Sequence, residues 1–426
     1  MGPGVDTSAS PAVVPAPLRH LVEQLWAPAL EGGGVRVVSR GAPSAGWTVA
    51  EEYYAVPTLD RATMLLPAGD RAVTVGALLN YRGLRRPVPN LQRTVLGGLV
   101  RAGGALPFPR VQVQVHTPDD AASLPLAHVA RALGRDEVRA SVGVRTGANR
   151  KATLQLVDAE GAPVGFAKLG WSAASDEAVH RESAALAATA TGAARSPGLL
   201  ATGTYGDHLF LVSSPLPLDA VGVRADVPPP TPQELAALAP VVRRAPLRTS
   251  AQLLGVQRRA GKLPADPAAN EVRPLLTRLV EALLAGDVEL PITARWHGDL
   301  TPWNSARDRA GVLWCWDWES SEPDAVAGLD SIYWHVTVQT ETGARLEVPT
   351  VQRAFELATP QLVAAGIPRE ARPLVLGVYV ATMAERACSL AAGPGGWEEE
   401  WVTPAQLVDL LRHAIDQVAG GGTGPA

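Results

Sequence analysis

The stretch WHGDLTPWNSARDRAGVLWCWDWE, residues 296–319, decides how the rest of this chain is interpreted. His297, Asp299 and Asn304 form the pattern His-x-Asp-(x)4-Asn, and the apolar run 312–316 leads from there to Asp317. The tripeptide His-Gly-Asp is common by itself, but the full pattern, followed by a strand-like run and a further Asp, is much rarer. The stretch therefore predicts a site built from a loop, a short strand and a turn.

These residue types are the ones that transfer of a phosphoryl group from a nucleotide requires. A carboxylate orients the attacking hydroxyl and accepts its proton, and an Asn and an Asp hold the magnesium ion that bridges the phosphates. The spacing assigns the first role to Asp299 and the second role to Asn304 and Asp317. The competing interpretation, an Asp buried in a Trp-rich turn, is weakened by the completeness of the pattern.

The pattern resembles the aminoglycoside phosphotransferase and choline kinase branch of the protein-kinase-like superfamily. The residues that match its catalytic loop and metal-binding segment are His297, Gly298, Asp299, Asn304, Asp317, Trp318 and Glu319. Asp330, in the sequence GLDSIYW, matches the Asp that opens the next helix in that family. The resemblance covers about residues 131–418, implies ATP and Mg²⁺ as cofactors, and gives His297 and Asp330 structural roles at the site.

The chain around this stretch predicts an α+β protein. Residues 131–220 contain four strand-like runs, with one amphipathic helix at 176–190 before the last of them. Residues 221–418 are mostly helical, interrupted by the dense stretch 294–318. The resemblance implies that these parts are the small β-rich lobe and the larger helical lobe of a bilobal protein-kinase-like fold.

Further segments lie outside these two lobes. Residues 17–130 mix strand-like runs with helix-like stretches, and we interpret them as an additional amino-terminal α+β module of unknown role. Residues 1–16 and 419–426 are small, Pro-rich or Gly-rich, and we expect both to be disordered. The four strand-like runs of the small lobe are VRASVGV, KATLQLVD, APVGFAKLG and HLFLVSS.

A second pair of residues supports the same resemblance. Lys168 lies near the end of the third strand-like run, and Glu182 follows fourteen residues later on the helix. They resemble the strand lysine and helix glutamate of the family, which implies that Lys168 contacts the α and β phosphates and that Glu182 fixes it. Glu177 is an alternative partner for Lys168. The alternative to a functional pair is that Lys168 lies at a strand edge and that Glu182 is a solvated helix residue.

The nucleotide loop departs from the family pattern. The segment SVGVRTGANRKATL contains Gly143 and Gly147 but no Gly-x-Gly-x-x-Gly. We retain both glycines as candidates for the turn that covers the phosphates. The order of elements further predicts that the backbone near Val212 and Ser214 binds the adenine edge, although an ordinary buried strand has the same composition.

Four residues are candidates for binding the phosphate acceptor. Trp303 is a candidate pocket wall, because aromatic rings stack on sugars or bases. Glu319, Glu322 and Asp324 are candidates for an ammonium group, as found in aminoglycosides, amino sugars and choline. A solvated turn around Pro323 is the alternative for Glu322 and Asp324. The extra module also occurs in some sugar kinases of the superfamily, so a carbohydrate hydroxyl is a further candidate acceptor.

Composition excludes other classes of protein. The formal charge of −4 and the pI of about 6.1 argue against nucleic-acid binding, which needs a clustered excess of Lys and Arg. No apolar run approaches about 20 residues and no signal peptide opens the sequence, so we expect a cytoplasmic protein with no membrane partner. The two cysteines, Cys315 and Cys388, have no metal-ligand spacing. Oligomeric state is not indicated.

The sequence thus predicts a small-molecule kinase that transfers the γ-phosphate of ATP to a hydroxyl of a sugar, amino sugar, aminoglycoside or amino alcohol. The alternative is a catalytically weak or inactive nucleotide-binding scaffold that acts through the amino-terminal module. Retention of Asp299 speaks against the scaffold, which has no need of a base. A protein kinase is disfavoured because no Arg precedes Asp299.

Overall fold

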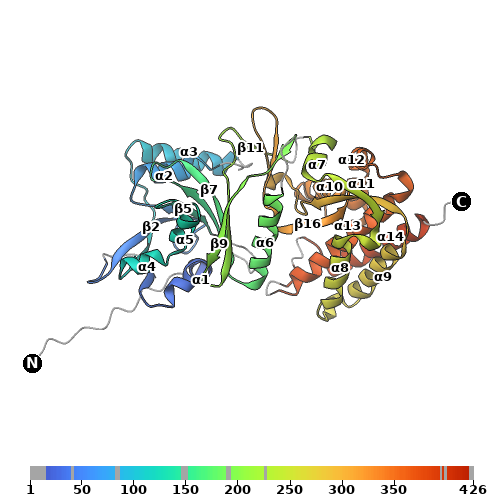
Figure 1. The fold of residues 1–426 in the computed structure, drawn as a ribbon, viewed down its shortest axis with the longest axis horizontal. Coiled ribbons are helices and arrows are strands. Elements are labelled where there is room, and N and C mark those ends of the chain that lie inside the picture. Colours follow the sequence, from blue (N-terminus) through green and yellow to red (C-terminus); the bar gives the residue numbers. More distant parts are fainter. Residues whose placement is uncertain are drawn as a thin grey trace, which may run out of the picture. The chain divides into compact units, whose positions relative to one another are not determined.

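The computed structural model describes residues 16–39, 43–81, 87–144, 152–188, 193–224, 228–393, 396–397 and 401–421. The chain forms two compact units. The first, here called the sheet unit, comprises Met1–Ser183 and Gly198–Leu218, and the second, the helical unit, comprises Ala184–Pro197 and Asp219–Ala426. The predicted α+β class is confirmed, with a part rich in sheet and a part that is mostly helical (Figure 1).

The sheet unit is built on one nine-stranded antiparallel sheet with the order β1-β4-β2-β3-β5-β6-β7-β10-β9. Its strands are β1 (Val35–Val38), β2 (Thr48–Val56), β3 (Met64–Pro67), β4 (Arg110–Val115), β5 (Arg139–Gly143), β6 (Thr153–Val157), β7 (Pro163–Leu169), β9 (Leu199–Tyr205) and β10 (His208–Ser213). Its helices are α1 (Ala16–Leu30), α2 (Arg71–Leu79), α3 (Pro87–Arg101), α4 (Pro118–Ala122), α5 (Pro125–Ala132) and α6 (Ala173–Ala187), the last of which ends in the helical unit.

Helices cover both faces of this sheet. Leu65 packs into a core that includes Trp26 of α1 and Val129 of α5, whereas Leu66 packs into a second core with Leu78 of α2. Successive residues of a strand point to opposite faces of a sheet, so the two cores lie on opposite faces. The runs of apolar residues in β3 and β6 follow from this burial on both sides.

The sheet continues without interruption from residues 17–130 into residues 131–220. Strand β3 pairs with β5, with Met64 opposite Gly143 and Leu65 opposite Val142. Both segments also contribute to the core around Leu65. A function for residues 17–130 as a separate module stays a prediction, and the structure adds that these residues extend the sheet that carries Lys168.

The helical unit contains two small sheets. One has the order β11-β14-β15-β8 and the other the order β12-β13-β16. The strands are β8 (Ala194–Arg195), β11 (Val221–Gly222), β12 (Val241–Pro246), β13 (Glu289–Trp296), β14 (Ser305–Arg307), β15 (Leu313–Cys315) and β16 (Glu322–Val326). The helices are α7 (Pro232–Leu238), α8 (Ala251–Lys262), α9 (Val272–Ala285), α10 (Leu329–Glu341), α11 (Val348–Leu357), α12 (Thr359–Ala364), α13 (Arg372–Ala391) and α14 (Pro404–Gly421).

Helix α13 forms the centre of the helical core. Its buried residues, among them Val375, Tyr379 and Ala384, pack in one cluster with residues of α9 and α14. Among the described residues, the helical stretch Arg369–Ala391 is the one long and apolar enough to span a membrane, and 67% of its most apolar window is buried inside the protein. The sequence expectation that no apolar run approaches this length was therefore wrong, and packing in the core explains the composition.

Candidate active site

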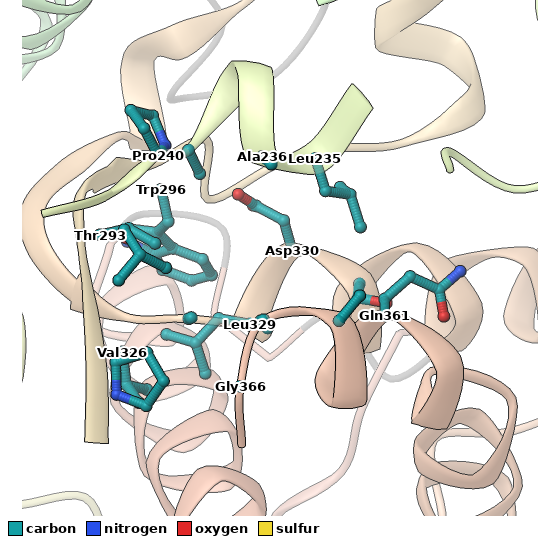
Figure 2. Close-up of a pocket in the computed structure, with 18 of the residues that line it drawn as sticks. Leu235, Ala236, Pro240, Thr293, Trp296, Val326, Leu329, Asp330, Gln361 and Gly366 are labelled. Carbon is teal, nitrogen blue, oxygen red and sulfur yellow. The ribbon is translucent and has the colours of Figure 1, made fainter. Parts of the chain in front are cut away.

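The catalytic-loop pattern lies in the helical unit, directly after β13. The carboxylate of Asp330, in the first turn of α10, accepts hydrogen bonds from the backbone N–H groups of His297 (2.8 Å) and Gly298 (2.9 Å). Figure 2 shows Asp330 near Trp296, the last residue of β13. Burial raises the pKa of Asp330 to about 6, while the two N–H groups act in the opposite direction. This geometry supports the predicted role of Asp330 as the residue that orients the loop.

Gly298 is required by the backbone of this loop. Its φ is +81°, and a Cβ at this position would lie 2.2 Å from the carbonyl oxygen of Ser320. A side chain would therefore clash with backbone as well as adopt an unfavourable conformation. The close approach brings the catalytic loop against the segment that follows Asp317.

His297 connects the loop to the strand before Asp317. The side chain is fully buried. Its Nδ1 accepts from the N–H of Asp299 (3.3 Å), which places the ring proton on Nε2, and Nε2 donates to the carbonyl of Trp316 (3.1 Å). The ring also lies 4.3 Å from the ring of Trp318. Both ring nitrogens are engaged inside the protein, which supports a structural role.

Asp299 and Asn304 are in direct contact. The Asn304 amide donates to Oδ2 of Asp299 (2.8 Å) and to its backbone carbonyl (3.1 Å). The pKa of Asp299 is raised to about 7, first by burial and then by the negative charges of Asp317 and Glu319. A hydrogen bond from Tyr333 and the charge of Arg386 partly oppose this rise. A carboxylate with its pKa near neutrality is well suited to accept a proton.

Asp317 has an unusual backbone conformation. Its φ of 70° and ψ of 55° lie in the left-handed region, at the start of the 3₁₀ turn Trp318–Ser320. This region is sparsely populated by residues other than glycine, and such residues concentrate at functional sites. Trp318 anchors the turn, because it is 1% exposed and its Nε1 donates to Ser196 Oγ (3.0 Å). The turn thus holds Asp317 near Asp299.

Two residues of the site carried no motif in the sequence. Arg386 of α13 donates to the carbonyls of Gly298 (2.5 Å) and Ser320 (3.0 Å), and so joins the catalytic loop to the Asp317 turn. Tyr333 lies one helical turn after Asp330, and its hydroxyl acts to lower the pKa of Asp299. The position of Tyr333 one helical turn after Asp330 could have indicated from the sequence that it lies at the site. No sequence pattern around Arg386 indicates that it does.

In the sheet unit, Lys168 and Glu182 form a buried ion pair. The Nζ of Lys168, on β7, lies 2.9 Å and 2.6 Å from the two carboxylate oxygens of Glu182, on α6. The side chains are 13% and 4% exposed. Glu177 lies on the same helix, but it is mostly exposed and pairs with Arg181. The geometry therefore supports Glu182, and not Glu177, as the partner of Lys168.

The other predicted nucleotide residues of the sheet unit have different surroundings. Gly143 is the last residue of β5, and Gly147 lies outside the described residues. Val212 sits in a strand with neighbours on both sides, opposite Ala167 and Ala201. The backbone N–H of Ser214 donates to the carbonyl of Gly198 (2.7 Å), and the Ser214 hydroxyl accepts from the N–H of Gly198 (2.9 Å). A nucleotide role for these four residues stays a prediction.

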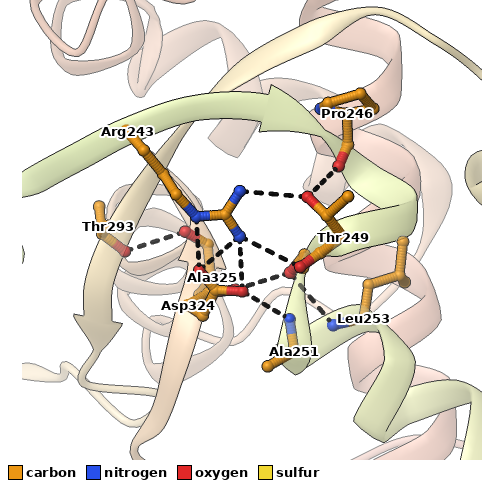
Figure 3. A network of polar contacts seen from close by, with 9 residues as sticks. Arg243, Pro246, Thr249, Ala251, Leu253, Thr293, Asp324 and Ala325 are labelled. Carbon is orange, nitrogen blue, oxygen red and sulfur yellow. Dashed lines mark hydrogen bonds and ion pairs between the residues drawn. The ribbon is translucent and has the colours of Figure 1, made fainter.

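The residues predicted to bind the acceptor fall into two groups. Trp303 is 39% exposed beside Asn304, and Glu319 follows Asp317 in its turn. Glu322, in contrast, is paired with Arg259 (2.6 Å). Figure 3 shows Asp324 held by two nitrogens of Arg243 at 2.7–3.0 Å.

The donors near Asp299 match the chemistry of magnesium. Magnesium prefers oxygen ligands, and one or two carboxylates commonly hold it at phosphate-transfer sites. Because Asn304 directs its amide nitrogen toward Asp299, Oδ1 is the Asn304 atom that could serve as an oxygen donor to a metal ion. The Asp317 carboxylate is the second oxygen donor, and its charge already acts on Asp299. The residues present therefore fit this ion.

Comparison with known proteins gives structural matches alone. No protein-family model matches the chain, and no curated protein matches it in sequence. Solved structures of small-molecule kinases match it. They include aminoglycoside phosphotransferase APH(4)-Ia with ADP and hygromycin B (12% identity, 70% of this chain and 99% of that one, TM-score 0.41).

Two further matches have similar values. Choline kinase LicA from Streptococcus pneumoniae has 12% identity over 66% of this chain and 90% of that one, with a TM-score of 0.37. Plasmodium vivax ethanolamine kinase has 10% identity over 83% of this chain and 94% of that one, with a TM-score of 0.38. All three belong to the group of kinases that the motif resembles.

Proposed function

We propose that this protein transfers the γ-phosphate of ATP to a hydroxyl of a small molecule. The observation that carries the proposal is the arrangement of Asp299, Asn304 and Asp317. Asp299 is oriented by the Asn304 amide at 2.8 Å, and its loop is held by the two backbone hydrogen bonds to Asp330. Positioning of this kind supplies much of the rate in phosphoryl transfer.

Asp299 acts as the base in this proposal. Its carboxylate aligns the acceptor hydroxyl and takes the proton as the oxygen bonds to phosphorus. The pKa of about 7 gives the carboxylate enough basicity for this role near neutral pH. Asn304 keeps Oδ2 of Asp299 in one orientation, so less ordering remains to be done when the acceptor binds.

Asn304 and Asp317 bind Mg²⁺ in this proposal. The ion supplies neutralisation of negative charge on the phosphates. Lys168, ordered by Glu182 in the sheet unit, binds the α and β phosphates. The distances of 2.9 and 2.6 Å from the Lys168 Nζ to the two Glu182 carboxylate oxygens support this role, because the ion pair orients the ammonium group. ATP and magnesium are therefore the proposed cofactors.

The acceptor belongs to the classes of sugars, amino sugars, aminoglycosides and amino alcohols. Trp303 offers an exposed aromatic face next to the catalytic loop, and such faces stack on sugar rings. Glu319 offers a carboxylate in the same segment. Glu322 and Asp324 are paired with arginines, so we assign recognition of a cationic group to neither of these two residues.

The test is Mg²⁺-dependent release of ADP across a panel of these four compound classes, with Asp299→Asn measured beside the natural protein. Asp416→Asn is the matched control, because Asp416 is exposed on α14. We expect one class to stimulate ADP release, with no stimulation in Asp299→Asn and full stimulation in the control. Equal stimulation in Asp299→Asn would remove Asp299 from the role of base.

A further inference from the structure

Arg386, near the end of helix α13, contacts both segments of the candidate active site. Its Nη1 donates to the carbonyl of Gly298 (2.5 Å), in the catalytic loop, and its Nη2 donates to the carbonyl of Ser320 (3.0 Å). Ser320 ends the 3₁₀ turn that begins directly after Asp317. Arg386 therefore connects the segment of the proposed base with the segment of a proposed metal ligand through their backbones.

The loop and the turn approach each other closely at this point. A Cβ on Gly298 would lie 2.2 Å from the carbonyl oxygen of Ser320 and 2.9 Å from Nη2 of Arg386. The two carbonyls that Arg386 binds are thus neighbours in space, although they are far apart in the sequence. Carbonyl oxygens carry like partial charges that repel each other, and a cation between them offsets the repulsion. Without that cation, we expect the loop and the turn to move apart.

The catalytic loop is held from two directions. The carboxylate of Asp330 accepts from the N–H of Gly298 (2.9 Å) and fixes the loop to α10. Arg386 binds the carbonyl of Gly298, which belongs to the peptide group that leads into Asp299. Because Arg386 also binds the turn, its contact with the loop is placed to set the separation between Asp299 and Asp317.

The contacts of Arg386 depend on the planar shape of the guanidinium group. Two of its nitrogens donate to two different segments, and its central carbon lies 4.7 Å from the centre of the Trp296 ring. No carboxylate of the described residues forms an ion pair with it. The ammonium group of a lysine is a point charge and does not reproduce this fork. A lysine should therefore replace Arg386 poorly, although it keeps the charge.

We propose that Arg386 is a positioning residue, which holds the base Asp299 and the metal ligand Asp317 at a fixed separation. It acts through backbone carbonyls of the two segments and not through the reacting groups themselves. The inference rests on the proposed function, because it assigns Arg386 a part in the same reaction. A misplacement of about 1 Å between reacting groups can lower a rate about 10²-fold, so a contact of this kind has a measurable effect.

Arg259 of α8 provides a matched control. Its guanidinium also joins two elements, because it pairs with Glu322 (2.6 Å) and with Glu385 of α13 (2.9 Å). Neither partner belongs to the catalytic loop or to the Asp317 turn. Arg259→Met should therefore lower the melting temperature, because it leaves two acids without their partner, and should change the turnover rate per folded molecule less than twofold.

The kinetic test is Mg²⁺-dependent ADP release by Arg386→Met and Arg386→Lys, with the compound class that stimulates the natural protein. At saturating Mg²⁺, we expect Arg386→Met to lower kcat about 10²-fold while the KM for ATP changes less than threefold. The Mg²⁺ concentration that gives the half-maximal rate should rise, because Asp317 is no longer held beside the loop. Arg386→Lys should lower kcat at least tenfold. If Arg386→Met does not fold, Arg386→Lys decides by the same criteria.

Hydrogen–deuterium exchange of the full-length protein gives a readout that does not depend on activity. Arg386→Met should accelerate exchange in peptides that cover 296–304 and 317–322, whereas Arg259→Met should leave 296–304 unchanged. Failure of the natural protein to release ADP with any acceptor would remove the kinase proposal, and exchange would still show whether Arg386 holds the two segments. Unchanged exchange in both segments, a kcat within twofold of the natural value, or an equal loss of kcat in Arg259→Met overturns the role of Arg386.

Discussion

Two acidic segments of the helical unit, 317–319 and 322–324, have different electrostatic surroundings. Around Asp299, the charges of Asp317 and Glu319 add to the effect of burial and raise its pKa to about 7. In the next segment, Glu322 is paired with Arg259 and Asp324 with Arg243. The first arrangement holds negative charges close together in a partly buried place, and the second neutralises them.

This difference in charge pairing distinguishes a candidate catalytic segment from a segment that stabilises the fold. Like charges held close together cost stability and persist where chemistry uses them, whereas pairs of opposite charges are typical of structural networks. Asp324 illustrates the second case, since it also accepts from the N–H of Ala251 at the start of α8 (Figure 3). The residue thereby fixes α8 against β16. The comparison supports the proposed catalytic role of the first segment and a structural role of the second.

The largest expected effect comes from Asp299→Asn. We expect the turnover rate to fall about 10³-fold, within the range for loss of a general base.

The same substitution should also change the pH dependence of stability. The folded-state pKa of Asp299, about 7, exceeds the ordinary value of 3.8, so the folded protein binds more protons than the unfolded one and loses stability as pH rises between these values. Asn removes that loss, so the free energy of unfolding at pH 8 should rise. Denaturant titration at pH 8 measures this free energy of unfolding. A lower stability of Asp299→Asn than of the natural protein would contradict the contrast drawn between the two acidic segments.

Asp317→Asn should weaken Mg²⁺-dependent ATP binding at least tenfold, because it removes the proposed carboxylate ligand. Calorimetric titration with ATP, with Mg²⁺ and with EDTA, measures this directly. Binding in EDTA should be the same in the variant and in the natural protein. If the variant keeps the full benefit of Mg²⁺, Asp317 is not a ligand and its left-handed backbone has a purely structural origin.

Glu51→Gln separates the effect of burial from the effect of like charge. Glu51 is buried on β2, accepts from the Tyr53 hydroxyl (2.8 Å), and has its pKa raised from 4.5 to about 7 chiefly by burial. The folded state again binds the extra proton, so stability is lost as pH rises from 4.5 to 7. Above pH 7, Gln should raise the free energy of unfolding by roughly 2–3 kcal/mol.

The pH series shows whether Glu51 is responsible. Near pH 4, where the carboxyl is protonated in both states, Glu51→Gln should match the natural protein in denaturant titration. The exposed Glu160→Gln serves as control and should follow the natural protein at every pH. An equal effect of Glu51→Gln at pH 4 and pH 8 would show that packing, and not charge, explains the change.

The smallest effect is expected from Arg243→Ala. The variant leaves Asp324 without its bidentate partner, but both side chains are partly exposed, which limits the expected loss to about 1–2 kcal/mol in the free energy of unfolding. The turnover rate per folded molecule should change less than twofold. Arg278→Ala, at an exposed position of α9, is the control. A tenfold loss of turnover without loss of stability would instead place this network in the site.

Local sequence patterns predicted many of the strands and helices. They did not predict where a helix ends when distant residues pair or pack with the segment that follows. The strands β5, β6, β7 and β10 follow the four predicted runs closely. Within residues 221–418, which were predicted to be mostly helical, α7 ends at Leu238, because Pro240 interrupts it and residues from Val241 pair with β13 as β12. In the same part of the chain, helices α11 and α12 are separate, with Pro360 at the start of the second.

The sequence by itself determined the types of residue at the candidate site, because a loop, a strand and a turn that follow one another carry His297, Asp299, Asn304 and Asp317 within 21 residues. Only the tertiary structure decided that Arg386 joins the loop to the turn and that residues 17–130 extend the sheet. These features depend on contacts between residues far apart in the chain. Local composition and periodicity record the burial of a residue, but they do not record the identity of its distant neighbour.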